Sequence, residues 1–206
     1  MQKIALILAS ASPRRKELLR RVGLQPEVHP PDVDETIIAG ESPAALATRL
    51  ASAKCRQVAD ALDAGSDRLI LAADTVVVVD QAILGKPVDQ DDARCMLESL
   101  SGRTHQVMTG VSLHRTDTRR QADGIGVTDV RFRVLDTAWI DWYLATGEPQ
   151  DKAGAYGIQG AGAVLVDSIR GSWSNVVGLP LEMLPGWLEA LGLSFQDLSV
   201  QPTRLP

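Results

Sequence analysis

The chain has 206 residues, enough for one domain with a sizeable hydrophobic core. Hydrophobic residues account for 45% of it and charged residues for 23%, which is typical of a globular protein. The net charge of -5 argues against a general nucleic-acid-binding surface, so any bound anion needs a local cluster of basic side chains. No apolar run approaches the roughly 18 residues of a membrane span, and the N-terminus lacks the layout of a signal peptide. We therefore expect a cytoplasmic protein that binds neither membranes nor nucleic acid.

The N-terminal part of the chain predicts a strand followed by two helices. Residues 4–8 form a continuous apolar run, as in a strand that is covered on both faces. Each helical stretch then starts with serine and proline, because serine caps exposed N–H groups and proline fits the first helical position. We expect one helix from its cap Ser12 to near Gly23 and another over residues 41–62, capped by Ser42.

The middle of the chain predicts strands around one helix. Residues 68–87 indicate a strand, a polar interruption at Asp74 and Thr75, a second strand, and a turn that leads into a short return strand. Acidic side chains begin the stretch 89–100, which suits the positive end of a helix. Residues 104–115 and 124–135 are rich in β-branched residues and are joined by a polar turn, which predicts a long hairpin.

The C-terminal part indicates a helix over residues 136–148, a glycine-rich stretch at 151–163, a strand at 164–169 and a mostly helical segment. Strands and helices interleave throughout, which predicts the α/β class with a mixed twisted sheet flanked by helices. We expect a single domain over residues 1–206, in which the residues beyond about 193 form a tail.

The two cysteines, Cys55 and Cys95, fall in predicted helices and have no paired-ligand spacing. We expect buried free thiols rather than a disulfide or a zinc site.

The stretch SASPRR raises the question of why two arginines occupy the positive end of a helix. A serine-rich turn before a helix presents backbone N–H groups and hydroxyl donors, Ser10 among them. Arg14 and Arg15 add forked donors that suit phosphate oxygens. A bound phosphate chain explains their placement; the alternative is that both arginines point into solvent.

Two acidic groups are candidate metal ligands. Asp74 in AADT is expected at the end of a buried strand, where open α/β sheets bind ligands, and it would ligate a divalent metal or orient a water. Glu35 in DVDET is a candidate ligand or acid/base partner. Magnesium held by one or two carboxylates and by substrate phosphates fits this pair. The alternatives are an ordinary turn aspartate and a solvated acidic loop.

Lysine is scarce, and Lys54, Lys86 and Lys152 lie beside predicted strand ends and glycine turns. They are candidate phosphate contacts, although a lone lysine is usually solvated. Gln159 in YGIQG carries a donor and an acceptor beside glycines, so its amide could contact the edge of a base. His105 is expected to be structural rather than catalytic, because no nucleophile is evident near it in the sequence.

Seven stretches in series resemble the Maf family of nucleoside triphosphate pyrophosphatases: LASASPRRKELL, DETI, SAKC, AADTVV, LGKP, LSGRTHQVMTGV and DKAGAYGIQG. The resemblance runs from residue 5 to about residue 182. It implies an inosine-triphosphatase-like α/β fold and hydrolysis of a nucleoside triphosphate to the monophosphate and pyrophosphate. It also implies a divalent metal cation (Mg2+, Mn2+ or Co2+), a cytoplasmic location and, in many members, a homodimer.

The resemblance further implies roles for individual residues. Asp74 matches the catalytic aspartate, described as the proton acceptor, and with Glu35 it would hold the metal. Arg15, Glu35, Lys54 and Lys86 match positions of the catalytic pocket.

The residues Arg14, Thr75 and Gln159 match the branch that is similar to dTTP/UTP pyrophosphatases rather than the branch acting on 7-methyl-GTP. The alternative function is a nucleotide-binding regulator of cell division or septum formation that acts without turnover. A water-activating carboxylate together with Lys54 and Lys86 favours turnover.

Overall fold

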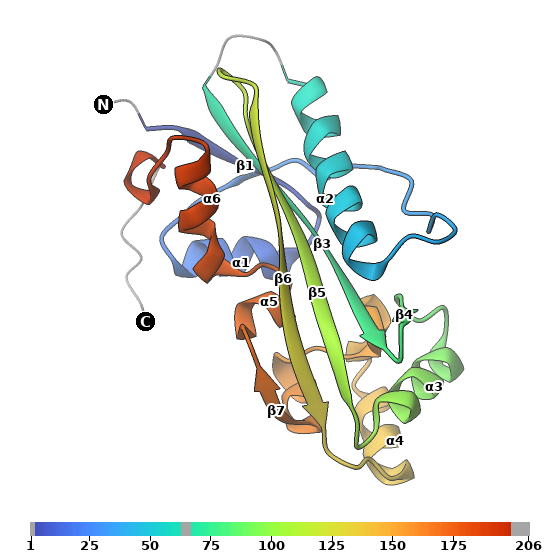
Figure 1. The fold of residues 1–206 in the computed structure, drawn as a ribbon. Helices are drawn as coiled ribbons and strands as arrows, with labels where there is room; N and C mark the ends of the chain where they lie inside the picture. The colour runs from blue at the N-terminus through green and yellow to red at the C-terminus, as the bar shows by residue number, and fades with distance from the viewer. Residues whose placement is uncertain (1–2, 63–66, 199–206) are drawn as a thin grey trace. The chain divides into compact units, whose positions relative to one another are not determined.

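The computed structural model describes residues 3–62 and 67–198. Within them, seven strands form a mixed sheet in the order β2-β1-β3-β5-β6-β7, with β4 paired to β3. Helices flank these strands, as Figure 1 shows, so the predicted α/β class and mixed sheet are confirmed.

The chain divides into two compact units. Unit 1 comprises Met1–Asp74, Thr109–Gly126 and Gly178–Pro206, and unit 2 comprises Thr75–Met108 and Val127–Val177. Strands β3 (Arg68–Val79), β5 (Thr104–Arg115) and β6 (Arg120–Phe132) each contribute residues to both units. The single domain stays a prediction, and residues 199–206 of the expected tail lie outside the described residues.

Unit 1 is built on parallel strands. Strand β1 pairs in parallel with both β2 and β3, which aligns Ala5–Ala9 with residues 68–72. Figure 1 shows α2 on one side of these strands and α1 and α6 on the other. The remaining elements of this unit are β2 (Glu27–Val28), α1 (Pro13–Arg21), α2 (Pro43–Asp60), η4 (Leu181–Met183), α6 (Leu184–Ala190) and η5 (Phe195–Asp197).

Local sequence rules account for the helix starts of unit 1. The Ser12 hydroxyl accepts a hydrogen bond from the Arg15 N–H at 3.4 Å, and the Ser42 hydroxyl accepts one from the Ala45 N–H at 3.2 Å. Proline occupies the first position of both helices. The two predicted caps are confirmed.

Strand β3 corrects the prediction of a polar interruption. It runs unbroken from Arg68 to Val79, so Asp74 lies in the middle of a strand and not at its end. Two residues with positive φ, Asp80 and Gln81, then form the predicted turn into β4 (Ala82–Leu84). The strand can include the charged Asp74 because its side chain has a partner, Lys54.

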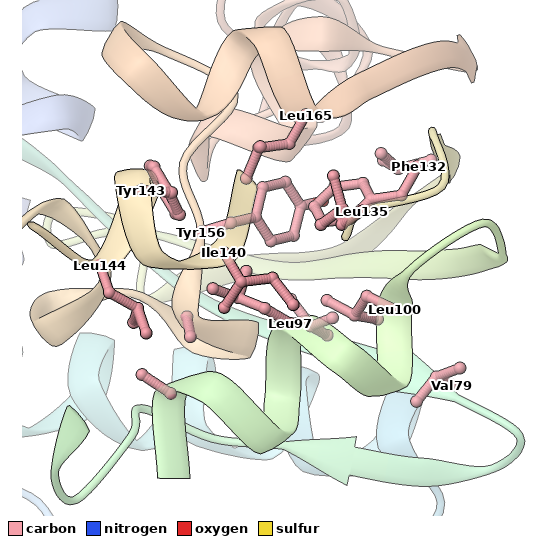
Figure 2. Close-up of a cluster of buried hydrophobic side chains, with 14 of the residues drawn as sticks. Val79, Leu97, Leu100, Phe132, Leu135, Ile140, Tyr143, Leu144, Tyr156 and Leu165 are labelled. Carbon is pink, nitrogen blue, oxygen red and sulfur yellow. The ribbon is translucent and has the colours of Figure 1, made fainter. Parts of the chain in front are cut away.

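Unit 2 surrounds its own hydrophobic cluster, shown in Figure 2. Tyr156 lies among the buried side chains and meets Phe132 and His105 edge to face, with ring centroids 4.7 and 5.3 Å away. The other elements of this unit are α3 (Gln90–Leu100), α4 (Thr137–Ala145), η1 (Glu148–Asp151), η2 (Ala153–Ala155), η3 (Gly160–Leu165), β7 (Val166–Arg170) and α5 (Trp173–Val177).

The cysteines differ in exposure. Cys55 on α2 is buried, as expected, but Cys95 on α3 is exposed, so the prediction of a second buried thiol is wrong. Helix α3 buries Ala93, Leu97 and Leu100, and Cys95 lies off that face. None of the helices in the described ranges is long and apolar enough to cross a bilayer.

Candidate active site

An ammonium group joins two carboxylates in unit 1. Lys54 Nζ lies 2.6 Å from Asp74 Oδ1 and 2.5 Å from Glu35 Oε1. The side chains of Lys54 and Asp74 are only 11% and 12% exposed, whereas that of Glu35 is 55% exposed. The buried pair of Lys54 and Asp74 is therefore accessible to solvent on the side of Glu35. Three of the predicted site residues are brought together here.

Helix α2 fixes the acidic loop that carries Glu35. The Gln57 side chain exchanges two hydrogen bonds with the Asp32 backbone, at 2.6 and 2.8 Å. Arg49 donates to the Thr36 carbonyl at 3.0 Å and binds the Glu41 carboxylate with two N–H groups. The loop is therefore anchored by hydrogen bonds on both sides of Glu35, although residues 34–40 are exposed, and its role in binding stays a prediction.

The Arg15 side chain turns into the protein. Its Nε donates to the Gly178 carbonyl at 2.8 Å and its Nη1 donates to the Ser10 hydroxyl at 3.1 Å. The same hydroxyl accepts a hydrogen bond from the Ser12 N–H at 3.1 Å, so Ser10 connects the backbone of this turn to the Arg15 side chain. Burial lowers the pKa of the Arg15 guanidinium, and the charge of Asp74 partly opposes that shift. The alternative that both arginines point into solvent is wrong for Arg15, and Arg14 is half-buried.

The other predicted site residues belong to unit 2. Thr75 follows Asp74 directly in β3 and is half-buried. Lys86 is exposed after β4, whereas Lys152 is half-buried and donates to the Glu148 carbonyl and the Asp151 carboxylate, both at 2.6 Å. Gln159 is half-buried and immediately precedes η3. Their roles in binding stay predictions.

One residue that the sequence did not single out organises the glycine-rich stretch. The Glu148 carboxylate accepts hydrogen bonds from the Ala161 N–H at 2.9 Å, the Gly162 N–H at 3.3 Å and the Tyr143 hydroxyl at 3.1 Å. The signal for this role in the sequence was the run of glycines, because glycine allows another group to come close to the backbone. That group is a carboxylate of the chain itself.

The donor set of unit 1 suits a hard cation. Asp74 and Glu35 both place a carboxylate oxygen against one positive charge, the Lys54 ammonium, so the two converge on a place where a cation is stable. Two carboxylates completed by substrate phosphates are the usual magnesium arrangement. No group of three or more His, Cys, Asp and Glu side chains in the described residues forms a complete protein cage for a metal.

His105 is a core residue of unit 2. It is 2% exposed, and its Nε2 lies 2.8 Å from the Tyr156 hydroxyl. Burial lowers its pKa to about 4, so the imidazole is neutral at pH 7. This placement agrees with the expected structural role.

Comparison with known proteins adds a family match. The family model described as Maf-like protein matches residues 5–191. Relatives named dTTP/UTP pyrophosphatase include one from Symbiobacterium thermophilum, 51% identical over 91% of this chain and 94% of its own length. Those from Anaeromyxobacter dehalogenans and Clostridioides difficile are each 48% identical, over 91% and 87% of this chain and 94% and 91% of their own lengths.

A search of solved structures finds the Staphylococcus aureus Ham1 protein. It is 15% identical, with a TM-score of 0.47 over 79% of each chain. This similarity is too low to carry an argument, so the fold assignment depends on the strand order and the family match.

Proposed function

Because this chain belongs to the Maf-like protein family, we propose that it hydrolyses nucleoside triphosphates, above all dTTP and UTP, to the monophosphate and pyrophosphate. The observation that carries the proposal is the Lys54 ammonium held between the Asp74 and Glu35 carboxylates. The names of relatives that are 48–51% identical over most of their length support the choice of substrates. A cytoplasmic location belongs to the same proposal.

The residues of unit 1 divide the chemistry between them. Asp74 accepts a proton from water as the water oxygen attacks the α-phosphorus, and the bond from that phosphorus to its bridging oxygen breaks. Lys54 and Arg15 stabilise the negative charge on the phosphate oxygens while pyrophosphate leaves. Such positioning and charge stabilisation supply most of the rate in phosphate chemistry, because the protein has little covalent work to do.

Asp74 and Glu35 would hold a divalent cation, Mg2+, Mn2+ or Co2+, with the substrate phosphates completing its ligands. When bound, the cation neutralises charge on the triphosphate and polarises its oxygens. Lys54 is then free to move from the carboxylates to the phosphates, and the exposure of Glu35 leaves room for that exchange.

The residues of unit 2 carry the remaining part of the proposal. Lys86 and Lys152 would bind phosphate oxygens. The pattern of the dTTP/UTP branch includes Thr75 of this unit and Arg14 of unit 1. Gln159 would contact the O2, N3–H and O4 edge that uracil and thymine share. Cytosine reverses that pattern at N3 and N4, so a matched site leaves buried groups unsatisfied with CTP.

The test measures pyrophosphate release by the purified protein from UTP, dTTP, CTP, GTP and 7-methyl-GTP, with magnesium and with excess chelator. We expect release from UTP and dTTP, much less from the others, and none with chelator. Asp74→Asn should abolish release, whereas Asp60→Asn, which removes an exposed carboxylate at the end of α2, should not.

The same assay separates the alternative function. A wild-type protein that binds UTP but releases no pyrophosphate would be a nucleotide-binding regulator rather than an enzyme. Orthophosphate as the product would move the attack to the γ-phosphorus and contradict the proposed reaction.

A further inference from the structure

The chain on either side of Gln159 is tied to two side chains. Before Gln159, the Gly157 N–H donates to the Tyr143 hydroxyl at 3.1 Å. After it, the Ala161 and Gly162 N–H groups donate to the Glu148 carboxylate at 2.9 and 3.3 Å. Tyr143 in turn donates to Glu148 at 3.1 Å, so the two anchors form one unit.

Two glycines of this stretch, Gly160 and Gly162, make that contact possible. A Cβ at Gly160, where φ is +66°, would lie 2.8 Å from Glu148 Oε2. A Cβ at Gly162 would lie 2.2 Å from the Gly157 carbonyl oxygen and 2.8 Å from the Tyr143 hydroxyl. Side chains at these positions would push the backbone off its anchors. The sequence suggested that glycine lets a ligand approach, but here it lets the chain wrap Glu148 and Tyr143.

Of the two anchors, Tyr143 is protected from competing water, whereas Glu148 is half-buried. Tyr143 is fully buried, and burial raises its pKa, so the phenol keeps its proton and can donate to Glu148. Figure 2 shows Tyr143 at the edge of the hydrophobic cluster of unit 2, with Leu144 and Ile140 of the same helix nearby. Helix α4 therefore fixes the hydroxyl, and the hydroxyl fixes the start of the loop.

We propose that Glu148, with Tyr143, is the positioning residue for Gln159 and thereby sets the preference for pyrimidine triphosphates. This inference depends on the proposed function. An amide recognises a base edge only if its orientation is fixed, because a rotation of the amide group exchanges the positions of its donor and its acceptor. Of the described residues flanking Gln159, three N–H groups hold the loop, and two of them end on Glu148.

The experiment compares the ratio of kcat/KM for UTP to that for CTP in Glu148→Gln, Gln159→Ala and the double variant. Glutamine keeps the size of Glu148 but replaces an acceptor oxygen with an amide donor, so it cannot satisfy all three donors. We expect the UTP:CTP ratio to fall about tenfold in Glu148→Gln, since a mispositioned hydrogen bond costs discrimination of this order. In the Gln159→Ala background, Glu148→Gln should change the ratio no further.

Two controls separate positioning from general damage. Asp141→Asn removes an exposed α4 carboxylate that pairs with Arg94, and it should leave the ratio unchanged. Hydrogen exchange at residues 157–162 should quicken in Glu148→Gln. If that variant does not fold, Tyr143→Phe takes its place; it removes the acceptor for the Gly157 N–H and the hydroxyl that donates to Glu148.

Three results would overturn the inference: an equal loss of UTP and CTP turnover, a further fall in the ratio in the double variant, or unchanged exchange at 157–162. If the wild type hydrolyses no nucleotide, the proposed function fails by itself. In that case the Kd values of UTP and CTP are measured for the same single and double variants. A binding preference for UTP that Glu148→Gln leaves unchanged would overturn the inference separately.

Discussion

Lys54 holds together two carboxylates that would repel each other without it. Asp74 is buried, and its carboxylate has Lys54 Nζ at 2.6 Å. The cost of removing one partner from a buried ion pair exceeds the benefit of forming the pair, since the other charge is left without compensation.

We predict that Lys54→Met lowers the free energy of unfolding by about 3 kcal/mol and lowers kcat/KM for UTP by at least about a hundredfold. Urea denaturation and pyrophosphate release measure the two effects. Lys16→Met, a change on α1, is the matched control and should alter neither value by more than a small amount. A fully stable Lys54→Met protein would show that the pair contributes nothing to the fold.

His105 predicts a pH dependence of stability. In the folded state burial lowers its pKa to about 4, whereas an unfolded histidine titrates near pH 6.5. Between these values the unfolded chain binds the extra proton, so stability is lost as the pH falls from about 6.5 towards 4. Above pH 6.5 the imidazole is neutral in both states and contributes no slope.

We predict that the wild type loses about 2 kcal/mol more stability than His105→Gln between pH 7 and pH 5. Glutamine retains a polar group toward Tyr156 and cannot titrate. Urea denaturation at the two pH values gives the comparison. Equal losses in wild type and His105→Gln would exclude His105 as the cause.

Residue-level rules succeeded where the cause is local. The caps Ser12 and Ser42 act on N–H groups three residues away, so a short stretch of sequence contains both partners. The more distant partners of Arg15 and Glu148 do not follow from any short stretch. Arg15 donates to Gly178, and Glu148 accepts from residues 13 and 14 positions further on. These contacts depend on the tertiary fold.

At the scale of elements, Asp74 shows why the strand boundary was misplaced. The sequence reads as two apolar runs interrupted by polar residues, whereas the backbone forms one strand of 12 residues. The charge of Asp74 is neutralised by Lys54, which lies 20 residues earlier on α2. Hydrophobic periodicity contains no information about such a partner, so it predicted an end where the strand continues.

The close packing of α2 against β5 within unit 1 gives an element-scale prediction. A Cβ at Gly110 would lie 2.3 Å from the Ala47 carbonyl oxygen and 2.6 Å from the Thr48 N. Both atoms are helix backbone, so α2 itself must shift to admit a methyl group. That helix also carries Lys54, Gln57 and Arg49.

We predict that Gly110→Ala lowers the free energy of unfolding by about 2–3 kcal/mol and reduces kcat/KM as well. Gly186→Ala is the matched control, because a Cβ there meets nothing within 4 Å, and it should stabilise α6 by about 0.5–1 kcal/mol. Thermal unfolding of the two variants should therefore shift in opposite directions. A shift in the same direction would contradict the packing argument.

At the scale of the whole molecule, three strands run through both compact units. The division of β3 falls between Asp74 and Thr75, which are consecutive in one strand, so unfolding one half of that strand would disturb the other half. This continuity favours unfolding in a single cooperative step, in line with the single domain predicted over residues 1–206.

We predict that Trp187→Phe unfolds with coincident transitions by fluorescence and by far-ultraviolet circular dichroism. The variant leaves Trp139, Trp142 and Trp173, all of which belong to unit 2, so fluorescence reports that unit alone. Circular dichroism reports the helices of both units. Two separated midpoints would mean that the units unfold independently.

The contrast between the two cysteines bears on how a dimer of this protein is to be recognised. Burial raises the pKa of Cys55 to about 12, which keeps that sulfur as an unreactive thiol, whereas Cys95 is exposed on α3. Air oxidation can therefore couple two molecules through Cys95. Such a covalent pair would migrate at twice the mass on a non-reducing gel and collapse to one chain with dithiothreitol. Only a pair that survives reductant, or persists in Cys95→Ser, counts as the homodimer that the resemblance implies.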